Sequence, residues 1–181
     1  MRRIGVAGAV AVVAVGIGLV GGTLAQAGDD DKRGDASAEL NGYQETPSIS
    51  TAARGRLRAH LDGSRITFQL RYEGLEGGSA DAAHLHFAQR HVAGDVSAFL
   101  CGGGSKPACP AGSGGTVEGT IVPSDVIGPA AQGIAAGQLD ELVRAIRAGA
   151  VYANVHTAIY PKGEIRGQLR AGSHDEDDDD D

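Results

Sequence analysis

Apolar and polar residues alternate along much of the middle of this chain, which is the pattern of strands with one buried and one solvated face. The clearest run is residues 55–75, "GRLRAHLDGSRITFQLRYEGL". Leu57, Ala59 and Leu61 alternate with basic residues, "DGS" interrupts the pattern, and the alternation resumes at Ile66. The segment therefore predicts a β-hairpin.

Further runs with a period of two follow along the chain, separated by clusters of Gly, Pro and Asp. They are "AHLHFA", "DVSAFL", "GTVEGTIV", "AVYANVHTAIY" and "GEIRGQLR". Six or seven such strands are typical of an antiparallel sandwich or barrel.

One segment has a helical period instead. In "QLDELVRAIRAG", Leu139, Leu142, Val143 and Ile146 share one helical face, and Gly149 occupies the position just past the helix end. We expect a single short helix before the last two strands. The sequence "YPKG" at 160–163 is then a turn that joins those strands as a hairpin.

The first 27 residues have the order of a secretory signal peptide. "MRR" precedes a long Gly/Ala/Val-rich apolar run, and "AQA" ends it, which predicts cleavage after Ala27. The alternative is an uncleaved N-terminal anchor, because the apolar run is nearly long enough to cross a bilayer. After cleavage we expect no membrane span, and a secreted or extracytoplasmic location in the cell envelope.

The formal net charge of -7 comes from the ends of the chain. Residues 29–31 and 175–181 hold ten of the 23 acidic residues, and without them and the two leader arginines 14 basic and 13 acidic residues remain. We predict a flexible acidic linker at 28–35, one domain at 36–172 and a disordered acidic tail at 173–181. A nearly neutral domain with no basic stripe excludes nucleic acid as a partner. The tail is either a solubility element or a weak binder of calcium and similar cations.

Cys101 and Cys109 are the only cysteines. In an oxidising compartment they predict a disulfide that closes the loop "CGGGSKPAC". Two thiolate metal ligands are the alternative, although the spacing is not that of a zinc ribbon.

Three histidines are candidate metal ligands. His84 and His86 share one face of a predicted strand, with Cβ atoms about 6.5 Å apart, so their imidazoles can converge on one ion. His156, on another predicted strand, is the candidate third ligand, and three imidazoles suit copper or zinc. The alternative is three buried or half-buried histidines hydrogen-bonded to backbone and to neighbours such as Asn154, Glu164 and Arg166.

The other histidines have weaker claims. His91 lies in the turn "QRHVAGD", where it is either a fourth ligand or a solvated loop residue. His60 lies on the solvent face of the hairpin and His174 precedes the acidic tail, and neither is assigned a role.

No motif in the sequence indicates an organic enzyme mechanism. GxSxG, HExxH, a P-loop and paired CxxC are all missing, so no catalytic residue is predicted. The enzymatic alternative that remains is redox chemistry at a histidine-bound metal.

Several blocks together resemble the CHRD domain, named for its repeats in chordin and widespread in secreted bacterial proteins. They are "AELNGYQETPS", "AHLHFAQ", "VSAFLCGG", "VIGPAAQGIAAGQLDELVRAIRAGAVYANVHT" and "YPKGEIRGQL". The resemblance implies an all-β, immunoglobulin-like or Greek-key β-sandwich and a secreted protein. The family motif includes His84, His86 and His156, whereas His91 stands where the family usually has a small residue.

The histidine pattern is also similar to that of copper/zinc superoxide dismutase, which opens its copper site with an HxH strand. The bridging histidine, the zinc-ligand aspartate and the electrostatic-loop arginine of that enzyme have no counterpart here. We therefore expect a non-enzymatic secreted binding or structural module with copper or zinc as its candidate ion. Its partner is an unidentified extracellular protein or envelope component, and a metal-dependent redox enzyme is the alternative.

Overall fold

The computed structural model describes residues 33–172, which form nine strands and one α-helix. The strands are β1 (Arg33–Asn41), β2 (Arg54–Asp62), β3 (Ile66–Glu73), β4 (Ala80–Phe87), β5 (Asp95–Cys101), β6 (Gly115–Ile121), β7 (Val151–Thr157), β8 (Ile165–Gln168) and β9 (Arg170–Ala171). The helix α1 is Leu139–Arg147. Single 3-10 turns occur at Gly42–Gln44, Pro123–Asp125 and Ala130–Gln132.

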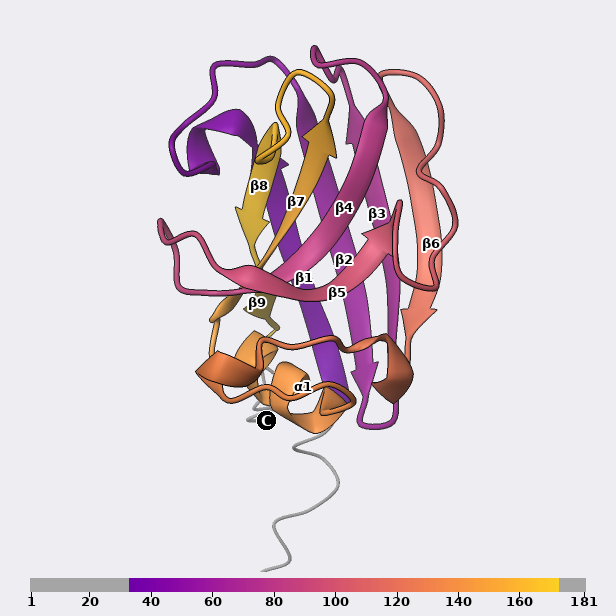
Figure 1. Cartoon of the computed structure of the whole chain (residues 1–181), viewed down its shortest axis with the longest axis vertical. Coiled ribbons are helices and arrows are strands. Elements are labelled where there is room, and N and C mark those ends of the chain that lie inside the picture. The colour runs from indigo at the N-terminus through magenta and orange to yellow at the C-terminus, as the bar shows by residue number, and fades with distance from the viewer. Residues whose placement is uncertain (1–32, 173–181) are drawn as a thin grey trace, which may run out of the picture.

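All nine strands belong to one antiparallel sheet in the order β5-β4-β7-β8-β1-β2-β3-β6, with β9 also paired to β1. The sheet curls so that β4 and β5 lie across the front of β1, β2 and β3, which gives a nearly closed barrel (Figure 1). The prediction of an all-β antiparallel fold is confirmed. The immunoglobulin-like division into two packed sheets stays a prediction.

The hairpin, the helix and the last turn lie at the residues that the apolar periodicity and the turn residues predicted. The β2–β3 hairpin pairs Leu61 with Ile66 across the "DGS" turn, and its buried positions alternate with exposed ones. The helix α1 precedes β7 and ends before Gly149, which has a φ of +67°. Gly163, in the turn between β7 and β8, has a φ of +121°. Both glycines therefore hold backbone conformations that L side chains rarely adopt.

The first strand differs from the prediction. Residues 33–35 were expected in the linker, but they form the start of β1, where Gly34 pairs with Leu61 and Asp35 with His60. Hydrogen bonding to the end of β2 orders this segment, whereas its composition of charged and small residues gave no strand pattern. The rest of the predicted linker, the leader and the acidic tail lie outside the described residues.

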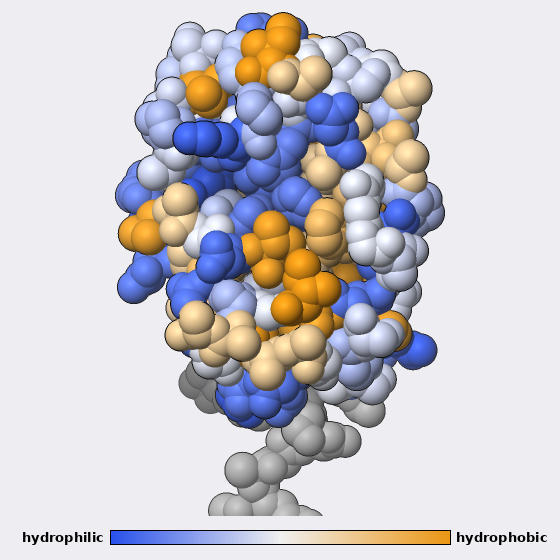
Figure 2. All heavy atoms as spheres, viewed as in Figure 1, coloured by the Kyte–Doolittle hydropathy of each residue, from blue (hydrophilic) through white to orange (hydrophobic). Residues whose placement is uncertain are grey.

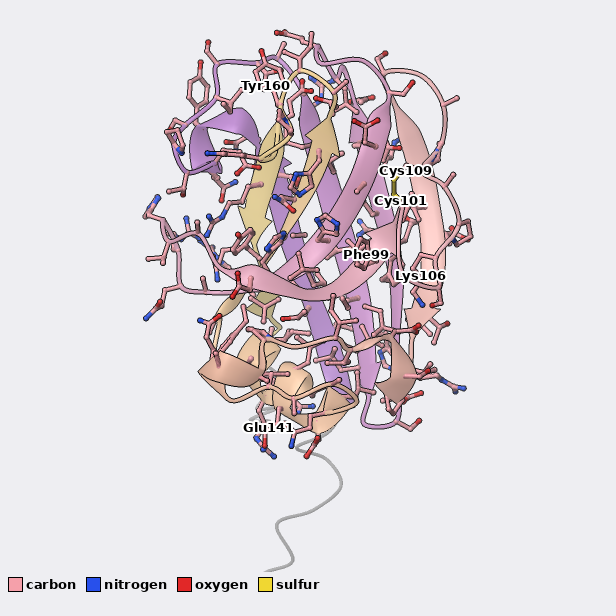
Figure 3. All side chains as sticks on the ribbon, viewed as in Figure 1. Phe99, Cys101, Lys106, Cys109, Glu141 and Tyr160 are labelled. Atoms are coloured by element: carbon pink, nitrogen blue, oxygen red, sulfur yellow. A yellow bond between two sulfur atoms is a disulfide. The ribbon has the colours of Figure 1, made fainter. Side chains whose placement is uncertain are left out.

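The core fills the barrel and is closed at its lower end by α1 (Figure 1). Its fully buried apolar side chains include Leu57, Leu70, Leu85, Leu142 and Ile146. The predicted disulfide is present: Cys101 at the end of β5 is bonded to Cys109 in the loop that leads to β6 (Figure 3). Within residues 33–172 no helix is long and apolar enough to cross a membrane.

Candidate metal centre

The pairing of β4 with β7 brings the three predicted histidines together. His84 lies opposite Asn154, His86 opposite Tyr152, and His156 opposite Ala82. Directly paired residues in a sheet share a face, and so do residues two apart along a strand. The three imidazoles therefore occupy one face of two neighbouring strands. Ala83 and Leu85, between and beside the histidines, point to the core instead.

The imidazoles are close enough to share an ion. One nitrogen from each of His84, His86 and His156 can be chosen so that all three lie within 4.8 Å of one another. His84 Nδ1 is 2.9 Å from His156 Nε2, and the ring centroids are 4.6 to 6.1 Å apart. In the described part of the chain this is the single group of three or more His, Cys, Asp or Glu residues with such spacing.

Backbone carbonyls fix the tautomers of two of the rings. His86 Nδ1 donates to the carbonyl of Gly94 at 2.9 Å, and His156 Nδ1 donates to the carbonyl of Pro161 at 3.1 Å. A carbonyl only accepts, so each Nδ1 must carry the proton and each Nε2 of the neutral ring must present a lone pair. Histidines that ligate metals are oriented by the same kind of bond from their second nitrogen.

The Nε2 lone pairs of His86 and His156 outnumber the N–H groups that lie close enough to donate to them. His86 Nε2 is buried and has no hydrogen-bond partner. His156 Nε2 lies 2.9 Å from Asn154 Oδ1, a second acceptor, and the same distance from His84 Nδ1. A single cation between the rings would satisfy these acceptors together, and buried acceptors that lack a partner are costly.

Burial keeps the imidazoles uncharged. His84 and His86 are 9% and 7% exposed. Burial lowers the pKa of His84 to about 3, helped by the nearby His156 and His86, and it lowers the pKa of His86 to about 4. The pKa of His156 is also lowered, again chiefly by burial. Neutral imidazoles at physiological pH are the form that binds metals.

Aromatic and cationic side chains pack around the rings. The Tyr152 ring stacks on His86 with centroids 4.7 Å apart and planes 2° apart, and the Arg166 guanidinium lies 3.4 Å from the Tyr152 centroid. Phe99 of β5 meets His84 edge to face at 4.6 Å and lies beside β4 (Figure 3). These contacts fix the ring planes of His84 and His86.

Arg166 is itself held by the loops that cover this face. Its guanidinium donates to Thr46 Oγ1 and to the carbonyls of Gln89 and Val92, at 2.9 to 3.2 Å. The side chain is 2% exposed. Hydrophilic residues gather over β4 and β7 in the space-filling view, above an apolar patch (Figure 2).

Glu45 is a buried acid near the cluster that sequence reasoning did not identify. It is 7% exposed, and its Oε1 has no hydrogen-bond partner. Burial raises its pKa to about 7, although Arg166, the Thr46 amide and the Asn154 side chain lower it. Glu45 lies in an irregular segment, where no periodicity marks a residue as buried, so the sequence carried no signal for it.

The remaining histidines lie apart from the cluster. His91 is exposed in the loop between β4 and β5, with a φ of +65°, and the described residues do not place it among the three rings. His60 pairs with Asp35 at 2.8 Å on the exposed face of the hairpin. His174 lies outside the described residues.

Of the neighbours expected to satisfy the histidines, Asn154 contacts His156 directly, while Arg166 acts through Tyr152. A third neighbour, Glu164, accepts from Thr51, Thr157 and the backbone of residues 76 and 77. The histidines are therefore only partly satisfied by protein groups.

Comparison with known protein families identifies the class of this all-β domain. The CHRD domain matches residues 36–169, so the chain belongs to the CHRD domain family. That span begins within β1 and ends after β8, and it includes the whole histidine cluster. No individually curated protein matches the chain.

Proposed function

We propose that this CHRD-domain protein is an extracytoplasmic, non-enzymatic binding module that holds one copper or zinc ion between His84, His86 and His156. The observation that carries the proposal is the pair of Nε2 lone pairs on His86 and His156, each fixed by a carbonyl bond at Nδ1; that of His86 is buried and has no hydrogen-bond partner. Imidazole nitrogen is a preferred ligand of both metals.

The type of ligand favours copper, because copper binds more tightly than zinc to a given set of nitrogen ligands. The three candidate nitrogens lie within 4.8 Å of one another. Two nitrogens bound to one ion at about 2.05 Å are at most about 4.1 Å apart, so the rings would close slightly around either ion.

A bound ion would connect two strands that are far apart in the sequence. His84 and His86 belong to β4 and His156 to β7. An ion that binds the folded and not the unfolded chain stabilises it by about 2.7 kcal/mol at a free concentration a hundred times the dissociation constant.

The experiment is a metal-binding titration on the purified protein and three single variants. Equilibrium dialysis against Cu(II), and separately Zn(II), should give one ion per chain in the parent and a loss of at least about tenfold in affinity for His86→Ala and His156→Ala, since removing a protein ligand weakens the site. His60→Ala is the matched control, because His60 is exposed on β2 and lies outside the cluster.

Thermal unfolding of the same proteins separates loss of a ligand from loss of fold. Copper should raise the melting temperature of the parent and of His60→Ala, and it should raise that of His156→Ala by less. Metal-free His156→Ala should still unfold cooperatively. Equal binding by all four proteins would contradict the proposal.

The location is part of the same proposal. The leader at 1–27, the Cys101–Cys109 disulfide and the CHRD family together support export, since disulfides persist in oxidising compartments. The proposal includes a single domain that extends from the start of β1 to residue 172, and an immunoglobulin-like layering of the sheet. Mass spectrometry of the protein produced by secreting cells should show a chain that begins at Gly28, and an intact N-terminus on exported protein would argue for the anchor.

A metal-dependent redox enzyme is the second candidate. Three protein ligands leave coordination positions open, as in catalytic sites, and His156 is only half-buried, so the cluster adjoins solvent. Copper-loaded protein that accelerates superoxide dismutation, with the acceleration lost in His86→Ala, would favour the enzyme. Loaded protein without such activity would exclude the form of the enzyme that resembles superoxide dismutase.

A further inference from the structure

A row of polar side chains lies on the exposed face of the sheet, away from the histidines. Four side chains form a row across neighbouring strands: Gln69 of β3 pairs with Arg58 of β2, Arg58 with Ser37 of β1, and Ser37 with Arg170 of β9. Paired residues share a face and neighbouring strands are about 4.8 Å apart. Arg58 and Arg170 therefore flank the Ser37 hydroxyl from two sides, with backbones about 10 Å apart.

This row lies in a groove of about 600 Å³ that also includes Arg56, Asp35 and His60. We call it the arginine groove. It has three arginines and one aspartate, and that aspartate is already paired with His60 at 2.8 Å. Arg56 is paired with Glu39 at 3.0 Å.

Two of the arginines have no counter-charge within the folded part of the chain. Arg58 and Arg170 are exposed, and neither makes an ion pair or side-chain hydrogen bond with any residue of 33–172. A neighbouring hollow of about 330 Å³ shares Ser37 and Arg170 with the groove and adds Arg90 and Glu39, the glutamate that is paired with Arg56. The groove and its border thus carry an excess of positive charge in a domain that is otherwise nearly neutral.

The described part of the chain ends beside this groove, three positions before the most acidic segment in the sequence. Gly172 lines the groove, and its N–H donates to the carbonyl of Asp35 at 2.7 Å. Residues 175–181 are "DEDDDDD", and Asp175 is three positions beyond Gly172. Three extended residues span about 10 Å, which is the distance across β9, β1 and β2 from Arg170 to Arg58.

We propose that the arginine groove binds an extended acidic segment, and that its occupant is residues 175–181 of the same chain. Single exposed ion pairs are weak, so binding would need several carboxylates at once and would weaken with salt. A tether of three residues compensates for the weakness of each ion pair, because it gives the acidic segment an effective concentration in the millimolar range. An acidic partner from outside would have to displace this segment.

A competition experiment on the whole chain tests the proposal. The probe is a fluorescein-labelled DEDDDDD peptide, and its anisotropy is measured at about 0.02 M salt, where charges at this range are poorly screened. The proteins are the parent and a neutral-tail variant in which every aspartate of 175–181 is changed to Asn and Glu176 to Gln. We expect the neutral-tail variant to bind the peptide at least about tenfold more tightly than the parent.

Arginine variants identify the surface. In the neutral-tail protein, Arg58→Ala with Arg170→Ala should abolish peptide binding. Arg54→Ala with Lys162→Ala removes the same charge from positions outside the groove, and it should leave binding unchanged. Equal binding to the parent and the neutral-tail variant, or no binding to either, would overturn the proposal. Loss of binding in the Arg54 and Lys162 control would do so as well, because it would reduce the effect to net charge.

Discussion

Burial decides how each ionisable residue near the histidine cluster behaves. The same desolvation that lowers the pKa values of His84 and His86 raises that of Glu45, so all three side chains favour their uncharged forms. The consequence for stability has opposite signs. The histidines contribute stability above their unfolded pKa that is lost as pH falls, while protonated Glu45 contributes stability at low pH that is lost as pH rises.

Glu45→Gln should reveal this effect. The pKa of Glu45 is about 7 in the folded protein, compared with 4.5 for an ordinary glutamate in the unfolded chain. Protonated Glu45 therefore stabilises the fold fully below pH 4.5, and this stabilisation is lost as the pH rises through 7. Gln has no charge to bury. The unfolding free energy of the variant relative to the parent should therefore rise by about 3 kcal/mol between pH 4.5 and pH 8.

Urea unfolding at several pH values, with a chelator present, measures the difference. Glu39→Gln on the exposed face of β1 provides the comparison for a solvated glutamate. Parallel stability curves for Glu45→Gln and the parent would show that Glu45 is ionised in the folded protein.

Gly163→Ala tests the packing that encloses Glu45. Gly163 has a φ of +121°, and a Cβ at this position would collide with the Glu45 carboxyl and the Asn154 amide. We expect a loss of about 2 kcal/mol or more in unfolding free energy, from strain and overpacking together. Gly133→Ala is the matched control, because Gly133 also has a positive φ but nothing within 4 Å of its Cβ position. Equal losses for the two variants would show that strain alone matters.

At this scale the sequence revealed the three histidines and little of what surrounds them. His84 and His86 were identifiable because a spacing of two puts them on one strand face, and His156 because it lies in a similar pattern. The stack of Arg166, Tyr152 and His86 was not identifiable. It depends on the loops around Thr46 and Gln89, whose folding over β4 and β7 leaves no local pattern.

At the scale of elements, short-range patterns predicted most of the strands and the helix. The β2–β3 hairpin and α1 have strong apolar periodicity, and their bounds follow it closely. The pattern of β1 is weaker: its buried residues are Ala36, Ala38 and Leu40, and it was missed. Small residues carry little apolar surface, so the formation of β1 depends on its pairing with β2 and not on an apolar pattern of its own.

Leu142→Ala tests the attachment of α1 to the end of the barrel. Leu142 is fully buried in the core. Truncation of a buried leucine creates a cavity and should lower the unfolding free energy by about 2–5 kcal/mol. The exposed Arg144, two positions along on the opposite face of the helix, supplies a control, since Arg144→Ala should change stability by less than about 0.5 kcal/mol. A small effect of Leu142→Ala would mean that the helix packs loosely.

The disulfide should stabilise the junction between β5 and β6. Cys101 and Cys109 close a short loop, and the chain-entropy model gives about 2.5 kcal/mol for a loop of this size. We expect Cys101→Ala with Cys109→Ala to unfold at correspondingly lower denaturant, with the histidine cluster still able to bind copper. Complete loss of copper binding in a folded double variant would show that the disulfide positions His84 through β5.

At the scale of the whole molecule, the order of strands determines the site. β4 and β7 are neighbours although more than sixty residues separate them in the sequence, and β8 then links them to β1. Strand order reflects long-range pairing that alternation within each strand does not encode. The sequence therefore predicted an antiparallel β fold, while the nearly closed barrel and the meeting of His84 with His156 required the structure.

The most direct test of the metal centre is a crystal structure of the protein soaked in copper, with anomalous scattering recorded at the copper edge. A metal centre between the three histidines should give one strong peak per chain, at about 2.0–2.1 Å from a nitrogen of each of His84, His86 and His156. A peak at the exposed His60 or His91 with none between β4 and β7, or no peak at saturating copper, would contradict it.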